Sequence, residues 1–220
     1  MSYSTQIKNA LNVKLAGTAL STILSVGLAA TLLAAPQQVS AQECLLDVDG
    51  DGVADAGDGT EGAEAVTVQS LACGADATAD SENANGDGAV ALGFGAQALG
   101  AGTLAIGNQV VADGNGAVAV GGDADSNGAN AITSATANGA SAFGAGAIAS
   151  GTNATAIGFN TVASGGGSIA LGDAATASFG NSVAIGNESI ASSTSAVALG
   201  NSASASGFGG SIAVGDTSDA

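Results

Sequence analysis

The stretch Asn181–Gly186 reads Asn-Ser-Val-Ala-Ile-Gly, and edited copies of it recur along the second half of the chain. Ten copies close at positions 93, 107, 121, 133, 144, 158, 172, 186, 200 and 215, on glycine at all but position 133. Six of the nine steps between these positions are 14 residues long, and the other three are 12, 11 and 15. A fixed short period predicts a solenoid with one supersecondary unit per repeat.

Each repeat contains two short runs with strand character. In Ser182–Ile185 small and large residues alternate, which is the pattern of a strand with two different faces. Gly186 and Asn187 follow, and both residue types favour a turn. A second run of small residues comes next, such as Ser204-Ala205-Ser206-Gly207. The repeat therefore predicts an all-β fold, a narrow parallel β-roll of about ten 14-residue rungs, each with two strands and two corners.

The side chains of one rung supply little core, because only about three of them are larger than alanine. A second buried surface would compensate. We therefore expect the small face of the strand, Ser182 and Ala184, to fill the lumen, and the large face, Val183 and Ile185, to pack between chains.

The pattern Asn-Ser-Val-Ala-Ile-Gly-x-x-Ser at Asn181–Ser189, with its period of 14, resembles the head repeat of YadA-type trimeric autotransporter adhesins. The resemblance covers roughly residues 88–215. It implies a left-handed β-roll, a homotrimer, a location at the bacterial cell surface associated with the outer membrane, and attachment to host cells or matrix proteins. The sequence shows neither the heptad stalk nor the amphipathic C-terminal strands of that family, so we expect no membrane anchor within this chain.

Residues 1–41 have the pattern of a secretory signal peptide. Lys8 and Lys14 supply the positive segment, residues 15–35 are largely apolar, and Val39-Ser40-Ala41 is a small-x-small cleavage site. An uncleaved membrane anchor is the alternative. Cleavage before Gln42 leaves a chain with no basic side chain, since the two lysines are the only ones among 220 residues.

Residues 42–86 form a different, acidic segment that holds a calcium-type loop. Acids stand at positions 1, 3, 5, 9 and 12 of the loop, Gly52 stands at position 6 for the sharp turn, and position 7 offers a backbone carbonyl. The spacing resembles calcium loops of thrombospondin type 3 and dockerin-like repeats, and the alternative is a solvated acidic linker. The expected Ca²⁺ ligands are Asp47, Asp49, Asp51, Val53, Asp55 and Asp58.

Cys44 and Cys73 flank that loop and are the only cysteines. In an exported chain two cysteines most simply pair with each other, and such a bond would stabilise a segment that has little core. Free or intermolecular thiols are the alternative.

The composition argues against several functions. With no histidine and no base after Lys14, acid–base chemistry would rest on carboxylates alone, and those of residues 87–220 fall mostly at corners, so we expect no enzyme. A net charge of −17 disfavours nucleic acid as a partner. The expected function is a surface adhesin head. The alternatives are a truncated or separately anchored structural surface protein, or an ice- or surface-binding solenoid.

The copy that ends at Thr133 departs from the period on both sides. Two readings of this stretch are open: a local irregularity of packing, or a place where a partner docks.

Overall fold

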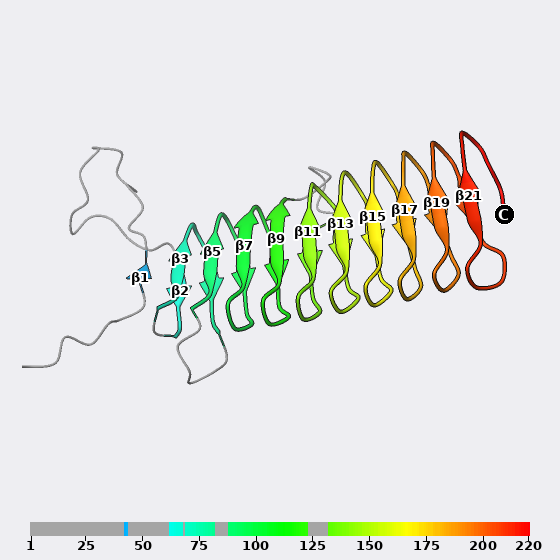
Figure 1. Ribbon diagram of the computed structural model, residues 1–220. Coiled ribbons are helices and arrows are strands. Elements are labelled where there is room, and N and C mark those ends of the chain that lie inside the picture. Colours follow the sequence, from blue (N-terminus) through cyan, green and yellow to red (C-terminus); the bar gives the residue numbers. More distant parts are fainter. Residues whose placement is uncertain (1–41, 44–61, 68, 82–87, 123–131) are drawn as a thin grey trace, which may run out of the picture. The chain divides into compact units, whose positions relative to one another are not determined.

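The computed structural model describes residues 42–43, 62–67, 69–81, 88–122 and 132–220. All of them lie within a unit that spans Val39–Ala220. The chain alternates between two parallel sheets, so that successive strands never pair and each strand pairs with the next but one (Figure 1). The solenoid predicted from the repeat is confirmed. Among the described residues, no helix has the length and apolar character needed to cross a bilayer.

The first sheet contains eleven strands, which carry the larger runs of the repeat. They are β1 (Gln42–Glu43), β3 (Leu71–Cys73), β5 (Val90–Leu92), β7 (Leu104–Gly107), β9 (Val118–Gly121), β11 (Ser141–Phe143), β13 (Thr155–Ile157), β15 (Ile169–Leu171), β17 (Val183–Ile185), β19 (Val197–Leu199) and β21 (Ile212–Val214).

The second sheet contains ten two-residue strands, which carry the smaller runs. They are β2 (Glu64–Ala65), β4 (Thr78–Ala79), β6 (Gln97–Ala98), β8 (Val111–Ala112), β10 (Ser134–Ala135), β12 (Ile148–Ala149), β14 (Val162–Ala163), β16 (Thr176–Ala177), β18 (Ile190–Ala191) and β20 (Ser204–Ala205).

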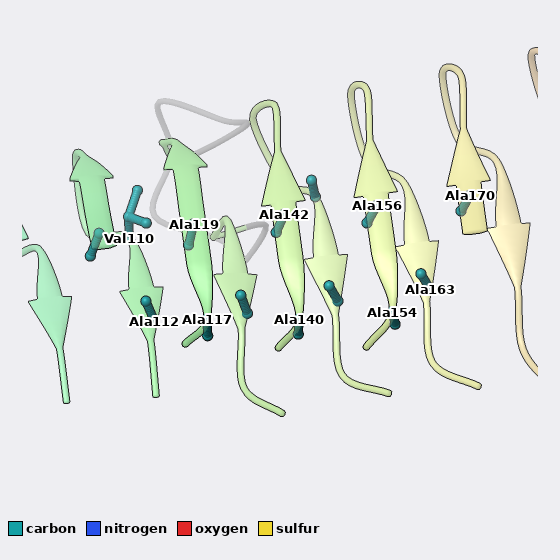
Figure 2. Close-up of a cluster of buried hydrophobic side chains, with 14 of the residues drawn as sticks. Val110, Ala112, Ala117, Ala119, Ala140, Ala142, Ala154, Ala156, Ala163 and Ala170 are labelled. Atoms are coloured by element: carbon teal, nitrogen blue, oxygen red, sulfur yellow. The ribbon is translucent and has the colours of Figure 1, made fainter. Parts of the chain in front are cut away.

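The space between the two sheets is filled almost entirely by alanine. Four positions of each rung point into it: the residue before each strand of either sheet, and the second residue of each strand. Alanine dominates these positions, with serine and threonine at some, and Val110 is the largest fully buried side chain (Figure 2). Ser182 and Ala184 are fully buried whereas Val183 and Ile185 are half-buried, so the small face fills the lumen as predicted.

The glycine that closes each large strand is required by the stacking of rungs. Nine of these glycines have φ between +122° and +137°, where other residues are strained. Gly215 ends the last rung, and the other eight are each followed by a further rung: Gly74, Gly93, Gly107, Gly144, Gly158, Gly172, Gly186 and Gly200. A Cβ on any of them would lie closer than 3.0 Å to the backbone of the closing glycine on the next rung. Only glycine therefore lets successive rungs approach to the ladder spacing at this corner.

The roll begins before residue 87, where we expected the acidic segment to end. Strands β2, β3 and β4 lie within that segment, and β3 pairs with β5 through Leu71↔Val90 and Cys73↔Leu92. Gly74 is therefore a further closing glycine, outside the ten copies of the repeat. It stands 19 residues before Gly93, five more than the period.

The prediction that the copy ending at Thr133 forms a strand of the first sheet is wrong, because β9 pairs directly with β11. Thr133 instead precedes β10 and is fully buried. Its hydroxyl accepts a hydrogen bond from Gly122 N at 3.0 Å and donates one to Gly144 O at 2.7 Å. The interval from Gly121 to Gly144 is 23 residues, nine more than the period, and is one enlarged rung.

Replacing either of two equivalent serines on adjacent rungs with alanine should affect the free energy of unfolding differently. Both are fully buried, but Ser182 Oγ donates to Phe179 O at 2.6 Å whereas Ser168 Oγ has no partner. Ser182→Ala should lower the free energy of unfolding by about 0.5–1.5 kcal/mol, and Ser168→Ala should leave it unchanged or raise it, because an unpaired buried hydroxyl is lost. Guanidinium denaturation measures both. Equal losses would contradict the difference in hydrogen bonding.

Candidate interaction surfaces

The outward face of the first sheet carries two columns of side chains, which we call the apolar columns. They consist of the first and third residues of β5 to β21. The third residues are all apolar: Leu92, Ile106, Val120, Phe143, Ile157, Leu171, Ile185, Leu199 and Val214. The first residues are apolar except Ser141 and Thr155.

The side chains of the apolar columns are half-buried or exposed. Leu171 is 40% exposed, Ile169 41% and Leu199 43%, and β21 shows Ile212 and Val214 at 63% and 62%. A roll whose lumen holds alanine thus presents its largest aliphatic groups outward in register, rung upon rung. Monomeric proteins rarely expose a continuous apolar area of this kind, and such areas mark interfaces.

The outward face of the second sheet is mixed in character. Its column mixes aliphatic and polar residues, namely Glu64, Thr78, Gln97, Val111, Ser134, Ile148, Val162, Thr176, Ile190 and Ser204. Ile190 is 44% exposed, as much as the residues of the apolar columns, yet Thr176 and Ser204 flank it. This face therefore lacks a continuous apolar surface.

A groove of about 540 Å³ opens along the corner that leads into the second sheet, and we call it the Phe94 groove. It crosses four successive rungs, from the corner before β4 to the residue pair before β10. Its lining consists of Asp76, Phe94, Gly95, Gln97, Gln109, Val111 and Ile132. An aromatic ring, one carboxylate and two primary amides meet there with aliphatic walls.

One position in the wall of the Phe94 groove carries no side chain. Asp76, Gly95, Gln109 and Ile132 stand at equivalent positions, two residues before β4, β6, β8 and β10. Three of the four project a side chain, and Gly95 projects none. A Cβ at Gly95 would lie 3.5 Å from Gln109 Cγ, so the gap lies beside that side chain. Phe94, next to Gly95, is 50% exposed.

The corner that follows the large strands also carries a short ladder of polar side chains. Asn187 Nδ2 donates to Asn201 Oδ1 at 3.0 Å, and Asn201 Nδ2 donates to Asp216 Oδ1 at 2.8 Å. All three residues are exposed. Their hydrogen bonds join successive rungs, which agrees with their interpretation as turn residues.

The residues predicted to bind calcium lie outside the described part of the chain, so the loop stays a prediction: Asp47, Asp49, Asp51, Val53, Asp55 and Asp58. Among the residues that the structure does describe, no group of three or more acids or cysteines is placed to hold a metal. Cys73 is in a disulfide. Its predicted partner Cys44 lies outside the described residues, and that pairing also stays a prediction.

Sequence reasoning missed the Phe94 groove altogether. One signal was available, because the chain has only five phenylalanines and Phe94 stands where most repeats have a small or polar turn residue.

Comparison with protein families agrees with the geometry. The model described as "YadA head domain repeat (2 copies)" matches residues 84–109, 135–161 and 163–189. A comparison with curated proteins finds no match. The matched segments include β5 to β7, β11 to β13 and β15 to β17, so the family's repeat coincides with rungs of the roll. The match implies a function of the surface adhesin type and a place at the bacterial cell surface.

Proposed function

Because this chain contains YadA-type head repeats, we propose that it forms the head of an exported adhesin that attaches bacteria to host cells or matrix proteins. The observation that supports this most is the agreement between the matched repeat and the rungs of the roll. The exposed apolar columns add a physical reason for assembly, because one roll alone leaves its largest side chains in water.

The head assembles as a homotrimer through the apolar columns. In a C3 arrangement the same face of each chain meets its two neighbours, so one column pattern serves all three contacts. The columns contain no charged residue from Val90 to Val214, which suits a buried interface. The corners and the outer face of the second sheet then stay exposed for attachment.

The attachment test uses the exported chain, purified from Gln42 onward, on immobilised extracellular matrix proteins and cultured epithelial cells. We expect saturable binding to at least one of these surfaces, with serum albumin as the negative surface. Because a trimer carries three binding sites, its apparent affinity for a surface can exceed that of one site by about 10²–10⁴-fold. Binding no greater than to albumin on every surface would overturn the proposed function.

We also propose that the acidic loop between the two cysteines binds one Ca²⁺. The acids at loop positions 1, 3 and 5 supply most of the charge, so replacing two of them should abolish binding. We expect the double substitution Asp49→Asn and Asp51→Asn to remove the calorimetric signal of Ca²⁺ addition. The control is Asp173→Asn with Asp216→Asn, which removes the same charge from corners of the roll. A signal that disappears in both variants, or is absent in the unmodified chain, would contradict a specific loop.

A further inference from the structure

We propose that the Phe94 groove binds an arginine side chain of a basic segment in a partner protein. The groove lies beside the second sheet, away from the apolar columns through which we expect the chains to associate. It is thus a separate surface from the interface between chains.

The shape of the groove suits one long side chain. Four rungs at about 4.8 Å spacing give it a length of roughly 14 Å, and its volume is about 540 Å³. Gly95 is half-buried and has no side chain to cover its backbone, so a ligand can approach the main chain there. Phe94 rises beside this opening, half exposed in the isolated chain.

The lining matches the parts of an arginine one by one. The Phe94 ring offers a face for a planar guanidinium, an attraction of about 0.5–1 kcal/mol at an exposed site. Asp76 offers a carboxylate, and the side-chain carbonyls of Gln97 and Gln109 offer further acceptors, which suits a group with five donors and no acceptor. Val111 and Ile132 form aliphatic walls against which a methylene stem packs.

The charge of the whole chain selects the same sign of ligand. The only two basic residues are Lys8 and Lys14, both within the predicted leader, against 19 acids in the sequence. The electrostatic potential of the exported chain therefore attracts cations, and basic segments associate with the chain faster at low ionic strength. An anionic ligand would find no cationic side chain anywhere in residues 42–220.

This inference rests on the proposed function in one respect, since it names the chemistry of a partner for the head. The two fail separately. Loss of peptide binding with intact attachment to surfaces would overturn the groove alone, and loss of attachment with intact peptide binding would overturn the adhesin head alone.

The test measures binding of a fluorescein-labelled peptide, Gly-Arg-Gly-Arg-Gly, to the exported chain at 0.02 M salt. The control peptide carries citrulline in place of arginine, which keeps the shape and removes the charge. We expect the citrulline peptide to bind at least tenfold more weakly. We also expect arginine-peptide binding to weaken as salt rises to 0.5 M, because screening shortens the range of the attraction.

Matched variants locate the site within the chain. Phe94→Ala should weaken binding about tenfold, whereas Phe159→Ala should not, although Phe159 occupies the same corner position and is 47% exposed. Asp76→Asn should weaken binding and flatten its salt dependence. Its control is Glu188→Gln, because Glu188 stands at the equivalent position before β18 with φ +55° against +56° for Asp76.

A third variant fills the groove without disturbing the fold. Gly95→Asn places a side chain in the gap, and the backbone tolerates it, since Asn160 already occupies the equivalent position with φ +50° against +60° at Gly95. We expect it to abolish peptide binding at an unchanged melting temperature.

Three outcomes would overturn the proposal. The first is equal binding of the arginine and citrulline peptides. The second is an equal loss in Phe94→Ala and Phe159→Ala, which would indicate diffuse attraction by the acidic surface. The third is binding of a neutral oligosaccharide such as maltotriose that Phe94→Ala removes, with no binding of the arginine peptide, which would make the groove a glycan site.

Discussion

Gly172→Ala should strongly destabilise the roll. Gly172 has φ +136°, and a Cβ there would overlap the backbone oxygen of Gly186 on the next rung. The strained backbone costs about 1–3 kcal/mol, and relief of the overlap costs a further 1–3 kcal/mol or so. Thermal unfolding by circular dichroism should show a fall of the melting temperature of roughly 4–24 °C, since each kcal/mol corresponds to about 2–4 °C for a chain of this size.

Two further glycines serve as controls for this prediction. At Gly166 the only neighbour of an added Cβ is Thr152 O at 3.9 Å, so Gly166→Ala should change stability little or raise it by about 0.4–1 kcal/mol. At Gly215 the φ is +125° but the nearest atom, Ser218 Cβ, lies 4.0 Å away. Gly215→Ala therefore isolates the backbone strain from the overlap and should fall between the other two. If Gly166→Ala and Gly172→Ala melt alike, the closing glycines are not what sets the spacing of rungs.

The alternation of small and large side chains within the repeat was sufficient to predict the fold and the residues that fill its lumen. In a solenoid of constant period, position 184 must stack on positions 170 and 198, so a small residue at one rung demands small residues at all of them. Alanine at each of these positions leaves room only for a narrow lumen. The larger residues at 183 and 185 then have no place except outside, as the structure shows.

The errors arose where the repeat is interrupted. Ile132-Thr133 has the same alternation as the end of a large strand, and four residues do not reveal which of the two sheets they join. The pairing of β9 with β11 decides it, and this depends on spacing rather than on local pattern. Leu71-Ala72-Cys73-Gly74 was missed for the opposite reason, because its acidic surroundings and its 19-residue step hid a regular rung.

The Phe94 groove was beyond sequence reasoning for a physical reason. Its walls come from residues on four rungs, and one of these residues, Gly95, has no side chain. Each residue by itself reads as an ordinary turn or strand residue. Only the stacking of Asp76, Gly95, Gln109 and Ile132 into one column brings an aromatic ring, a carboxylate and two amides to one place.

Leu171→Asp should convert the proposed trimer into single chains. Leu171 is the third residue of β15, in the middle of the apolar columns, and is 40% exposed in the isolated chain. In a trimer the substitution would bury three carboxylates against apolar neighbours, and each lacks a basic partner because the exported chain has none. In a single chain the same side chain points to water and costs little. We therefore expect multi-angle light scattering to change from three chain masses to one, while circular dichroism retains its β signal.

Ile190→Asp is the matched control that tests which sheet forms the interface between chains. Ile190 is 44% exposed, as much as Leu171, but it lies in β18 of the second sheet. It should leave the trimer intact, because that face carries no continuous apolar surface. If Ile190→Asp dissociates the assembly and Leu171→Asp does not, the chains associate through the second sheet and the apolar columns must be covered by another partner.

If the unmodified exported chain already has the mass of one chain at micromolar concentration, the trimer itself is contradicted. A single-chain product of Leu171→Asp that still binds the arginine peptide would further show that the Phe94 groove is complete within one chain.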